Sequence, residues 1–191
     1  MKAPDRVVII GGGSGMGLAL AKRVLAAGAE VVIAGRTHER LHAARTSLGA
    51  DRLEVATVDI GDRSQVAALF ARVDRFDHLV MTAADLPYGP VMQLTESDLM
   101  RAVRSKFLGP VFAAQESAAR IRPGGSITFT SGIAARRPMR GGSGARYWTS
   151  MEAIVSCEKR ASTPRQQLSS HTYDCVRRHG HRVHRRDRDV L

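Results

Sequence analysis

The sequence predicts an α/β protein built on a doubly wound parallel sheet. A β-branched apolar run at residues 7–10 leads into a glycine-rich loop and then into a helical pattern. Such a run is typical of a buried parallel strand, and the change to a 3.6-residue period indicates the first crossover helix. Strand and helix patterns then alternate to about residue 132, which is typical of a parallel sheet covered by helices on both faces. The 191 residues suffice for one domain with a sizeable core.

The elements are expected in a regular order along the chain. The predicted strands cover 7–10, 30–34, 53–58, 78–82 and 126–130. The predicted helices cover 15–29, 38–48, 63–72 and about 95–121. Gly28 closes the first of these helices, and Thr95-x-x-Asp98 is the pattern of a capping box at the start of the last one. Arg122-Pro-Gly-Gly125 is expected to separate that helix from the fifth strand.

The charge pattern divides the chain into two parts. The formal net charge is +11, but residues 156–191 alone hold nine Lys or Arg against four Asp or Glu. This stretch has no sustained hydrophobic period, so it cannot bury enough surface to offset the entropy of ordering. We therefore expect a globular domain over residues 1–155 and a basic, disordered tail over 156–191. The tail can attract phosphates, but nothing in it predicts a specific nucleic-acid partner.

Cysteine usage and hydropathy limit the environment of the protein. The two cysteines, Cys157 and Cys175, form no disulfide framework, which favours a reducing cytoplasm. No apolar run approaches the ~20 residues that span a bilayer, so no membrane association is expected. Cys175 and the histidines near it match no closed zinc pattern, and we predict no metal site.

The loop after the first strand predicts a site for the phosphates of a dinucleotide. Glycines at this position allow a tight turn, close approach of a pyrophosphate to the main chain, and close packing of helix on strand. The unpaired N–H groups at the start of the following helix favour an anion. The context of strand, glycine loop and helix makes this pattern more specific than a glycine string alone.

The spacing Gly11-x-x-x-Gly15-x-Gly17 resembles that of the short-chain dehydrogenase/reductase family. The resemblance covers roughly residues 5–140. It implies a Rossmann-type sheet in the order 3-2-1-4-5, incomplete at its C-terminal side, and hydride transfer between a nicotinamide cofactor and a small carbonyl or alcohol substrate. The residues expected to bind the cofactor are Gly11, Gly13, Ser14, Gly15, Met16, Gly17, Arg36, Thr37, Asp59, Ile60, Ala83 and Ala84.

The end of the second strand favours NADP(H) over NAD(H). An acidic residue there would bind the ribose 2′-hydroxyl, whereas an arginine accommodates a 2′-phosphate. This chain has Gly35 and then Arg36. The alternative is that Arg36 is an ordinary solvated loop charge.

Two further family positions follow the third and fourth strands. By resemblance Asp59 contacts the adenine, although it is equally suited to an Asx turn ahead of Gly61. The family's Asn-Asn-Ala-Gly segment corresponds to Met81-Thr82-Ala83-Ala84, which keeps the small residues and lacks the amides.

The family's catalytic residues are matched less completely than its cofactor-binding residues. The family uses a tyrosine whose pKa is lowered by a lysine four residues later, because an unperturbed tyrosine near pKa ~10 is a poor acid–base group at neutral pH. Tyr147 is the tyrosine in the expected region, but Met151 stands four residues on. The other alignment, which follows Met151–Ile154, places glycine and tryptophan at these positions. The family's serine corresponds to Ser131 or, by the commoner alignment, to Gly132, and Ser131 suits a turn before Gly132 equally well. Lys106 either faces the active site or is a solvated helix residue.

The family's sixth and seventh strands have no counterpart in residues 156–191. We hypothesise that the chain departs from the family sequence between residues 141 and 156, by a frameshift or an alternative reading. The fifth strand would then be an unprotected edge, and the family's usual oligomer interface would be altered. Two function classes remain open: an NADP(H)-dependent oxidoreductase, and a catalytically silent NADP(H)-binding or truncated relative.

Overall fold

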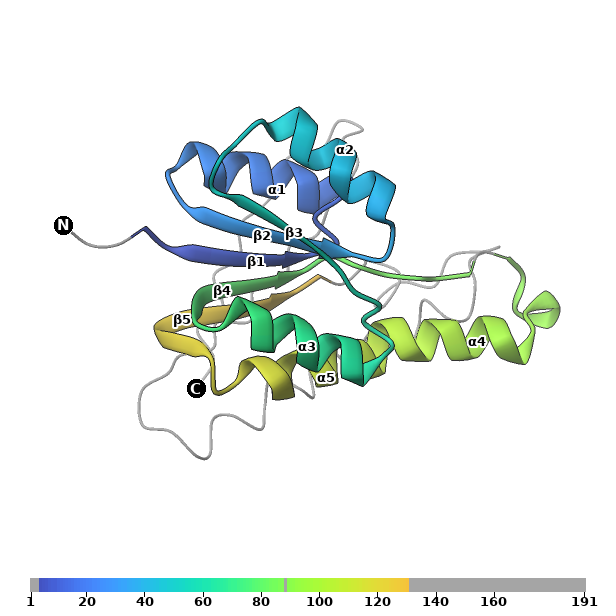
Figure 1. Ribbon diagram of the computed structural model, residues 1–191. Coiled ribbons are helices and arrows are strands. Elements are labelled where there is room, and N and C mark those ends of the chain that lie inside the picture. Colours follow the sequence, from blue (N-terminus) through green and yellow to red (C-terminus); the bar gives the residue numbers. More distant parts are fainter. Residues whose placement is uncertain (1–3, 88, 131–191) are drawn as a thin grey trace, which may run out of the picture.

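The computed structural model describes residues 4–87 and 89–130, and Figure 1 shows its arrangement. Its described part contains five strands: β1 Arg6–Ile10, β2 Glu30–Gly35, β3 Leu53–Thr57, β4 Phe76–Met81 and β5 Ile121–Phe129. They pair in parallel in the order β3-β2-β1-β4-β5. The predicted Rossmann-type sheet and its strand order are confirmed.

Helices cover both faces of this sheet. They are α1 Gly15–Ala26, α2 His38–Leu48, α3 Arg63–Val73, α4 Glu96–Val103 and α5 Gly109–Ser117, with a short turn η1 at Val91–Gln93 and a π-helical turn η2 at Arg104–Leu108. Figure 1 shows α1 and α2 on one face, α3 and α5 on the other, and α4 extending beyond the sheet. None of the helices in the described residues has the length and apolar character needed to cross a bilayer.

The core follows from the alternation of side chains along the central strand. Val7 and Ile9 of β1 pack in the cluster beneath α1 and α2, whereas Val8 and Ile10 pack in the cluster that includes α3 and Phe70. All four are buried. Successive side chains of a strand point to opposite faces, so a β-branched run without polar residues is required where both faces are covered.

The long helix expected over residues 95–121 is interrupted, and this part of the prediction is wrong. The capping box at Thr95 and Asp98 is present, but α4 ends at Val103 and is followed by η2, in which the Gly109 amide donates to the carbonyl of Arg104. Pro110 follows and has no N–H to donate to the preceding turn, which breaks the α-helical ladder. The helix resumes as α5 and stops at Ser117, before the expected end at Ile121.

The fifth strand also begins earlier than expected. Phe76 pairs with Ile121 and His78 with Ser126, so residues 122–125 form a bulge opposite Asp77 inside β5. The Arg122 guanidinium donates to the Asp77 carboxylate at 2.9 Å, and the Arg6 amide donates to the same oxygen at 2.7 Å. Arg122-Pro-Gly-Gly125 therefore interrupts the strand from within instead of preceding it. Among the described residues, β5 is an edge of the sheet.

Candidate functional site

A cleft of about 280 Å³ opens at the carboxyl ends of the central strands. In an open parallel sheet, this edge is where ligands bind, at the point where the strand order reverses around β1. The lining residues come from the ends of β1 to β4, the starts of α1 and α2, and η2. They are Ile10, Gly11, Gly13, Ser14, Gly15, Met16, Gly35, Arg36, Thr37, Arg40, Leu41, Val58, Asp59, Ile60, Thr82, Ala83, Ala84, Asp85 and Ser105.

The floor of the cleft is the loop between β1 and α1. The Gly11 amide donates to the carbonyl of Ala34 at 2.7 Å, which ties the loop to β2. Gly11 has φ +95°, in the left-handed region that favours glycine. A methyl group on Gly17 would overlap the Gly11 carbonyl oxygen and lie 2.7 Å from the Thr82 Oγ1. Glycine at position 17 thus permits α1 to pack directly on the loop.

Thr82 holds the other side of this loop. Its amide donates to the carbonyl of Ile10 at 2.8 Å, and its hydroxyl lies 3.3 Å from the carbonyl oxygens of both Ile10 and Gly11. The family has an amide side chain at this position, and here the threonine hydroxyl supplies a polar tether between β4 and the glycine loop.

The start of α1 faces the cleft with its backbone donors. Ser14 at the N-cap has extended φ and ψ, and its side chain makes no capping hydrogen bond. The first turn contains no acidic residue, and Gly15 and Met16 line the cleft. The first amides of a helix have no partner within it, and the helix dipole favours negative charge there. This arrangement suits a phosphate or pyrophosphate group.

The end of β2 contributes positive charge. Arg36 and Arg40 both line the cleft. The Arg36 guanidinium forms an ion pair with the carboxylate of Asp85, which follows β4, with 2.6 Å between Nη1 and Oδ2. Arg36 is thus not an isolated solvated charge, and its side chain remains about half exposed.

Asp59 lies at the end of β3, where the adenine of a dinucleotide is expected. Its Oδ1 accepts a 2.9 Å hydrogen bond from the Gly61 amide, and its own amide donates to the Gln65 side chain. The Asx turn weighed as an alternative is therefore present. Asp59 and Ile60 both line the cleft as well, so the turn and a role in the site are compatible.

The π-helical turn η2 places two residues, Ser105 and Lys106, near the carboxyl ends of the strands. Ser105 is buried, and its hydroxyl accepts a hydrogen bond from the Asp85 amide at 3.1 Å. Lys106 is half-buried, and its Nζ donates to the carbonyl of Thr130 at 3.0 Å. The lysine therefore lies at the carboxyl end of β5 and is not a fully solvated helix residue. A single-turn π segment is frequent at functional sites because it redirects side chains locally.

Eleven of the twelve residues expected to bind the cofactor line this one cleft. Gly17 is the exception, since it packs beneath the loop. Eight lining residues are not among those expected: the polar Arg40, Thr82, Asp85 and Ser105, and also Ile10, Gly35, Leu41 and Val58. Arg40 lies in the first turn of α2, four residues after Arg36, and could have been found from that spacing. Ser105 depends on η2, for which Pro110 is the local signal, although a proline does not by itself specify a π-helical turn before it.

Other predicted residues fall outside the part of the chain that the structure describes. These are the catalytic candidates Ser131 and Tyr147, the proposed point of departure between 141 and 156, and the basic tail from residue 156. Within the described residues, no three His, Cys, Asp or Glu side chains gather as they would around a metal ion.

A glycine loop at the reversal point of a parallel sheet in this order defines a Rossmann-type protein. The sequence model of the short chain dehydrogenase family matches residues 5–165, and the chain belongs to this family of oxidoreductases. The match runs past residue 140, where the resemblance based on motifs ends.

Individual relatives are similar over part of their length. The chain is 34% identical over 119 residues to the uncharacterized oxidoreductase YxnA of Bacillus subtilis, covering 58% of this chain and 33% of that protein. It is 32% identical over 149 residues to the short-chain dehydrogenase/reductase malC of Malbranchea aurantiaca, covering 69% of this chain and 56% of the relative. The chain thus spans between a third and little more than half of these curated relatives.

The fold is likewise similar to solved structures. L-Sorbose reductase of Gluconobacter frateurii, solved with NADPH and L-sorbose, superimposes with a TM-score of 0.74 at 25% identity. The similarity covers 81% of this chain and 62% of the reductase.

Proposed function

We propose that the cleft binds NADP(H), and that the protein acts as a short-chain dehydrogenase that interconverts a small carbonyl compound and its alcohol. The observation that carries the proposal is the combination of an uncapped helix start over a glycine loop with two arginines, Arg36 and Arg40, in the same cleft. A dinucleotide phosphorylated on its adenosine ribose has anionic groups at both places. The similarity to an NADPH-bound reductase supports the same cofactor.

The described residues divide the binding among themselves. The amides at the start of α1, around Gly15 and Met16, would hold the pyrophosphate. Arg36 would hold the 2′-phosphate through its forked donors, which fit phosphate geometry. Asp59 would face the adenine. The residues present fit the cofactor because the glycines of the loop leave room for backbone donors, and a Cβ built on Gly15 meets no atom within 4 Å.

When bound, the nicotinamide exchanges a hydride with the carbonyl carbon of the substrate, and the protein must move one proton to or from the substrate oxygen. We propose Tyr147 for this proton and Ser131 for holding the oxygen. With Met151 four residues after Tyr147, no lysine lowers the pKa of that tyrosine from the usual position. Lys106, at the end of β5, is a cation near the expected reaction centre.

The absence of Tyr-x-x-x-Lys favours a second candidate function, that of a protein which binds NADP(H) and does not turn over. The two candidates share the cleft and differ in the region of Ser131 and Tyr147. Only a rate measurement separates them, because both predict cofactor binding.

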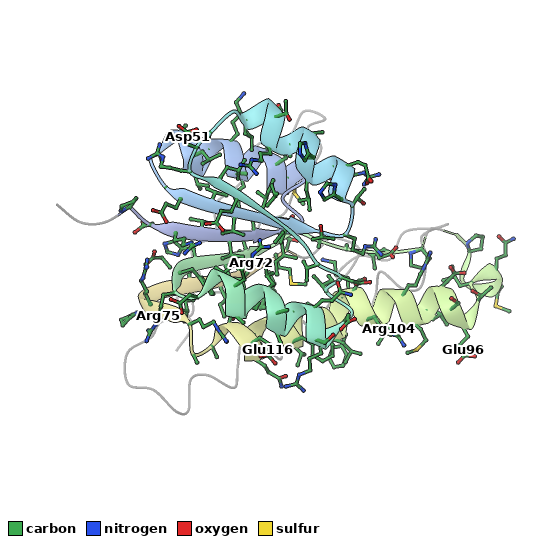
Figure 2. All side chains as sticks on the ribbon, viewed as in Figure 1. Asp51, Arg72, Arg75, Glu96, Arg104 and Glu116 are labelled. Carbon is green, nitrogen blue, oxygen red and sulfur yellow. The ribbon has the colours of Figure 1, made fainter. Side chains whose placement is uncertain are left out.

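The test is a fluorescence titration of the purified chain with NADPH and NADH. Gly15→Asp places a carboxylate beside the helix start and is expected to abolish NADPH binding. Gly49→Asp is the matched control, because Gly49 has φ +54° against +53° for Gly15 and lies in the turn after α2. That turn is marked by Asp51 in Figure 2, at the opposite end of α2 from the cleft.

Micromolar binding of NADPH by the wild type and by Gly49→Asp, lost in Gly15→Asp, supports the proposed cofactor. A screen of carbonyl substrates then decides between the two candidates. Failure of the wild type to bind either nucleotide contradicts the proposal.

A further inference from the structure

One ion pair crosses the cofactor cleft. Arg36 follows β2 and Asp85 follows β4, and these two strands flank β1 on opposite sides. Neighbouring strands lie about 4.8 Å apart, so the ends of β2 and β4 are separated by roughly 10 Å. The 2.6 Å contact between Nη1 and Oδ2 closes that gap beyond the glycine loop at the end of β1. The guanidinium that the proposed function assigns to the 2′-phosphate therefore already has an anionic partner.

Asp85 and Arg36 differ in how their residues are attached to the rest of the protein and in how exposed their side chains are. The Asp85 amide donates to the Ser105 hydroxyl at 3.1 Å, and that hydroxyl also lies 3.1 Å from the Asp85 carbonyl oxygen. Ser105 is 6% exposed and belongs to η2, so the backbone of Asp85 is attached to a buried position. The Arg36 side chain is 52% exposed against 24% for Asp85. A nucleotide that enters the cleft therefore meets an arginine whose side chain is half exposed and a carboxylate whose backbone is attached to Ser105.

We propose that Asp85 is a specificity-determining residue of the cofactor site, which lowers the preference of the cleft for nucleotides that carry a 2′-phosphate. This inference rests on the proposed function. Asp85 acts in two ways: it competes for the donors of Arg36, and its negative charge repels a phosphate bound beside that arginine. Both effects fall on the 2′-phosphate and leave the rest of the nucleotide unaffected.

The size of the effect is moderate because the pair is partly exposed. Exposed ion pairs contribute little, and solvent screens a nearby like charge. A guanidinium also keeps donors for phosphate when one Nη is engaged. Removal of the Asp85 charge is therefore expected to raise selectivity for the 2′-phosphate about three- to tenfold.

The experiment is calorimetric titration of the full chain with 2′,5′-ADP and with 5′-ADP, two fragments that share the adenosine and differ in the 2′-phosphate. Asp85→Asn removes the charge and keeps the backbone bonds to Ser105, so the fold is retained, as a thermal melt will verify. Glu116→Gln is the matched control. It removes a carboxylate from another arginine, Arg63, with 3.3 Å between Nε and Oε1. Neither residue lines the cleft, and Figure 2 shows Glu116 on the side of the sheet covered by α3 and α5.

The expected result is a three- to tenfold rise in the affinity for 2′,5′-ADP relative to 5′-ADP in Asp85→Asn, with no change of this ratio in Glu116→Gln. In the Arg36→Gln background, Asp85→Asn should raise the ratio by less, because competition for the guanidinium is gone. A structural role of Asp85 would alter both affinities together and leave the ratio unchanged.

Three outcomes overturn the inference. A ratio that is unchanged or lower in Asp85→Asn shows that Asp85 does not oppose the 2′-phosphate. A loss of 5′-ADP affinity in this variant shows that Asp85 acts on the part of the nucleotide that both fragments share. In both cases binding by the wild type leaves the proposed function intact, whereas a wild type that binds neither fragment contradicts the proposed function together with this inference.

Discussion

Gly17, in the first turn of α1, packs directly on the carbonyl of Gly11, and no side chain fits between them. A Cβ at position 17 would overlap that oxygen and approach the Thr82 Oγ1 to 2.7 Å. The contact joins the end of β1, the start of α1 and the end of β4 at one point. It therefore determines how closely the helix start approaches the cleft.

Gly17→Ala is expected to destabilise the protein by about 1–3 kcal/mol, because the added methyl forces the loop or the helix to move. The displacement of Gly11 should also weaken nucleotide binding. Urea unfolding measures the first effect. Gly35→Ala is the control, since its Cβ would meet the Leu41 side chain at an ordinary 3.8 Å. Equal stability of the two variants would contradict the close packing at Gly17.

Thr82→Val keeps the shape of the side chain and removes the hydroxyl that lies within reach of the Ile10 and Gly11 carbonyls. We expect a loss of about 1 kcal/mol in unfolding free energy. Amide exchange in the glycine loop should become faster. Thr57→Val, at an exposed position of β3, is the control. Slow exchange retained in Thr82→Val would show that the backbone bonds hold the loop without this hydroxyl.

Two carboxylates at helix starts should make stability depend on pH. Hydrogen bonds from Ser64 and from the Gln65 amide lower the pKa of Asp62 from its ordinary 3.8, and the Thr95 hydroxyl and amide lower that of Asp98. The folded state therefore binds these protons more weakly than the unfolded chain does. The resulting stabilisation is present above about pH 3.8 and is lost as the pH falls through the lowered folded values.

The measurement is the urea midpoint at pH 7 and pH 3 for the wild type and for Asp62→Asn combined with Asp98→Asn. Asparagine can still cap a helix but does not titrate. The double variant should lose less stability between the two pH values than the wild type. Asp51→Asn, at an exposed position, measures the effect of losing one carboxylate, which is half of the charge change in the double variant. A double variant with the same acid sensitivity as the wild type would refute the assignment.

Substitution of Phe70 tests the packing of the core beneath α3. Its side chain is fully buried, and its ring lies 5.7 Å from that of Phe76, centroid to centroid. Phe70→Ala should cost about 3–5 kcal/mol through lost burial and the cavity left behind. Met92→Ala, at a side chain that is 92% exposed, should stay within about 0.5 kcal/mol of the wild type in the same urea titration. Small losses in both would mean that this face of the sheet is not packed as described.

The prediction of the fold succeeded where the signal is local. The run Val7–Ile10, the glycines behind it and the periodic helix α1 specify one strand–loop–helix unit, and parallel strands place all such loops at one edge. That is why the sequence alone predicts Arg36, Asp59 and Ala83, which follow three different strands, in one cleft. The expected ends of elements differ from those observed where a local irregularity intervenes, as at η2 and in the bulge of β5.

The amino-acid sequence by itself determined the class of fold, the strand order expected from family resemblance, and the glycine loop, because these depend on hydrophobic period and on backbone freedom at neighbouring positions. The tertiary structure alone decided the partner of Arg36, since Asp85 is 49 residues away and meets it only when β2 and β4 flank β1. It also decided the burial of Ser105, because the π-helical turn that contains this residue cannot be predicted from hydrophobic periodicity. Asp85 contacts both Arg36 and Ser105 because the packing of strands and helices brings together residues that are far apart in the chain.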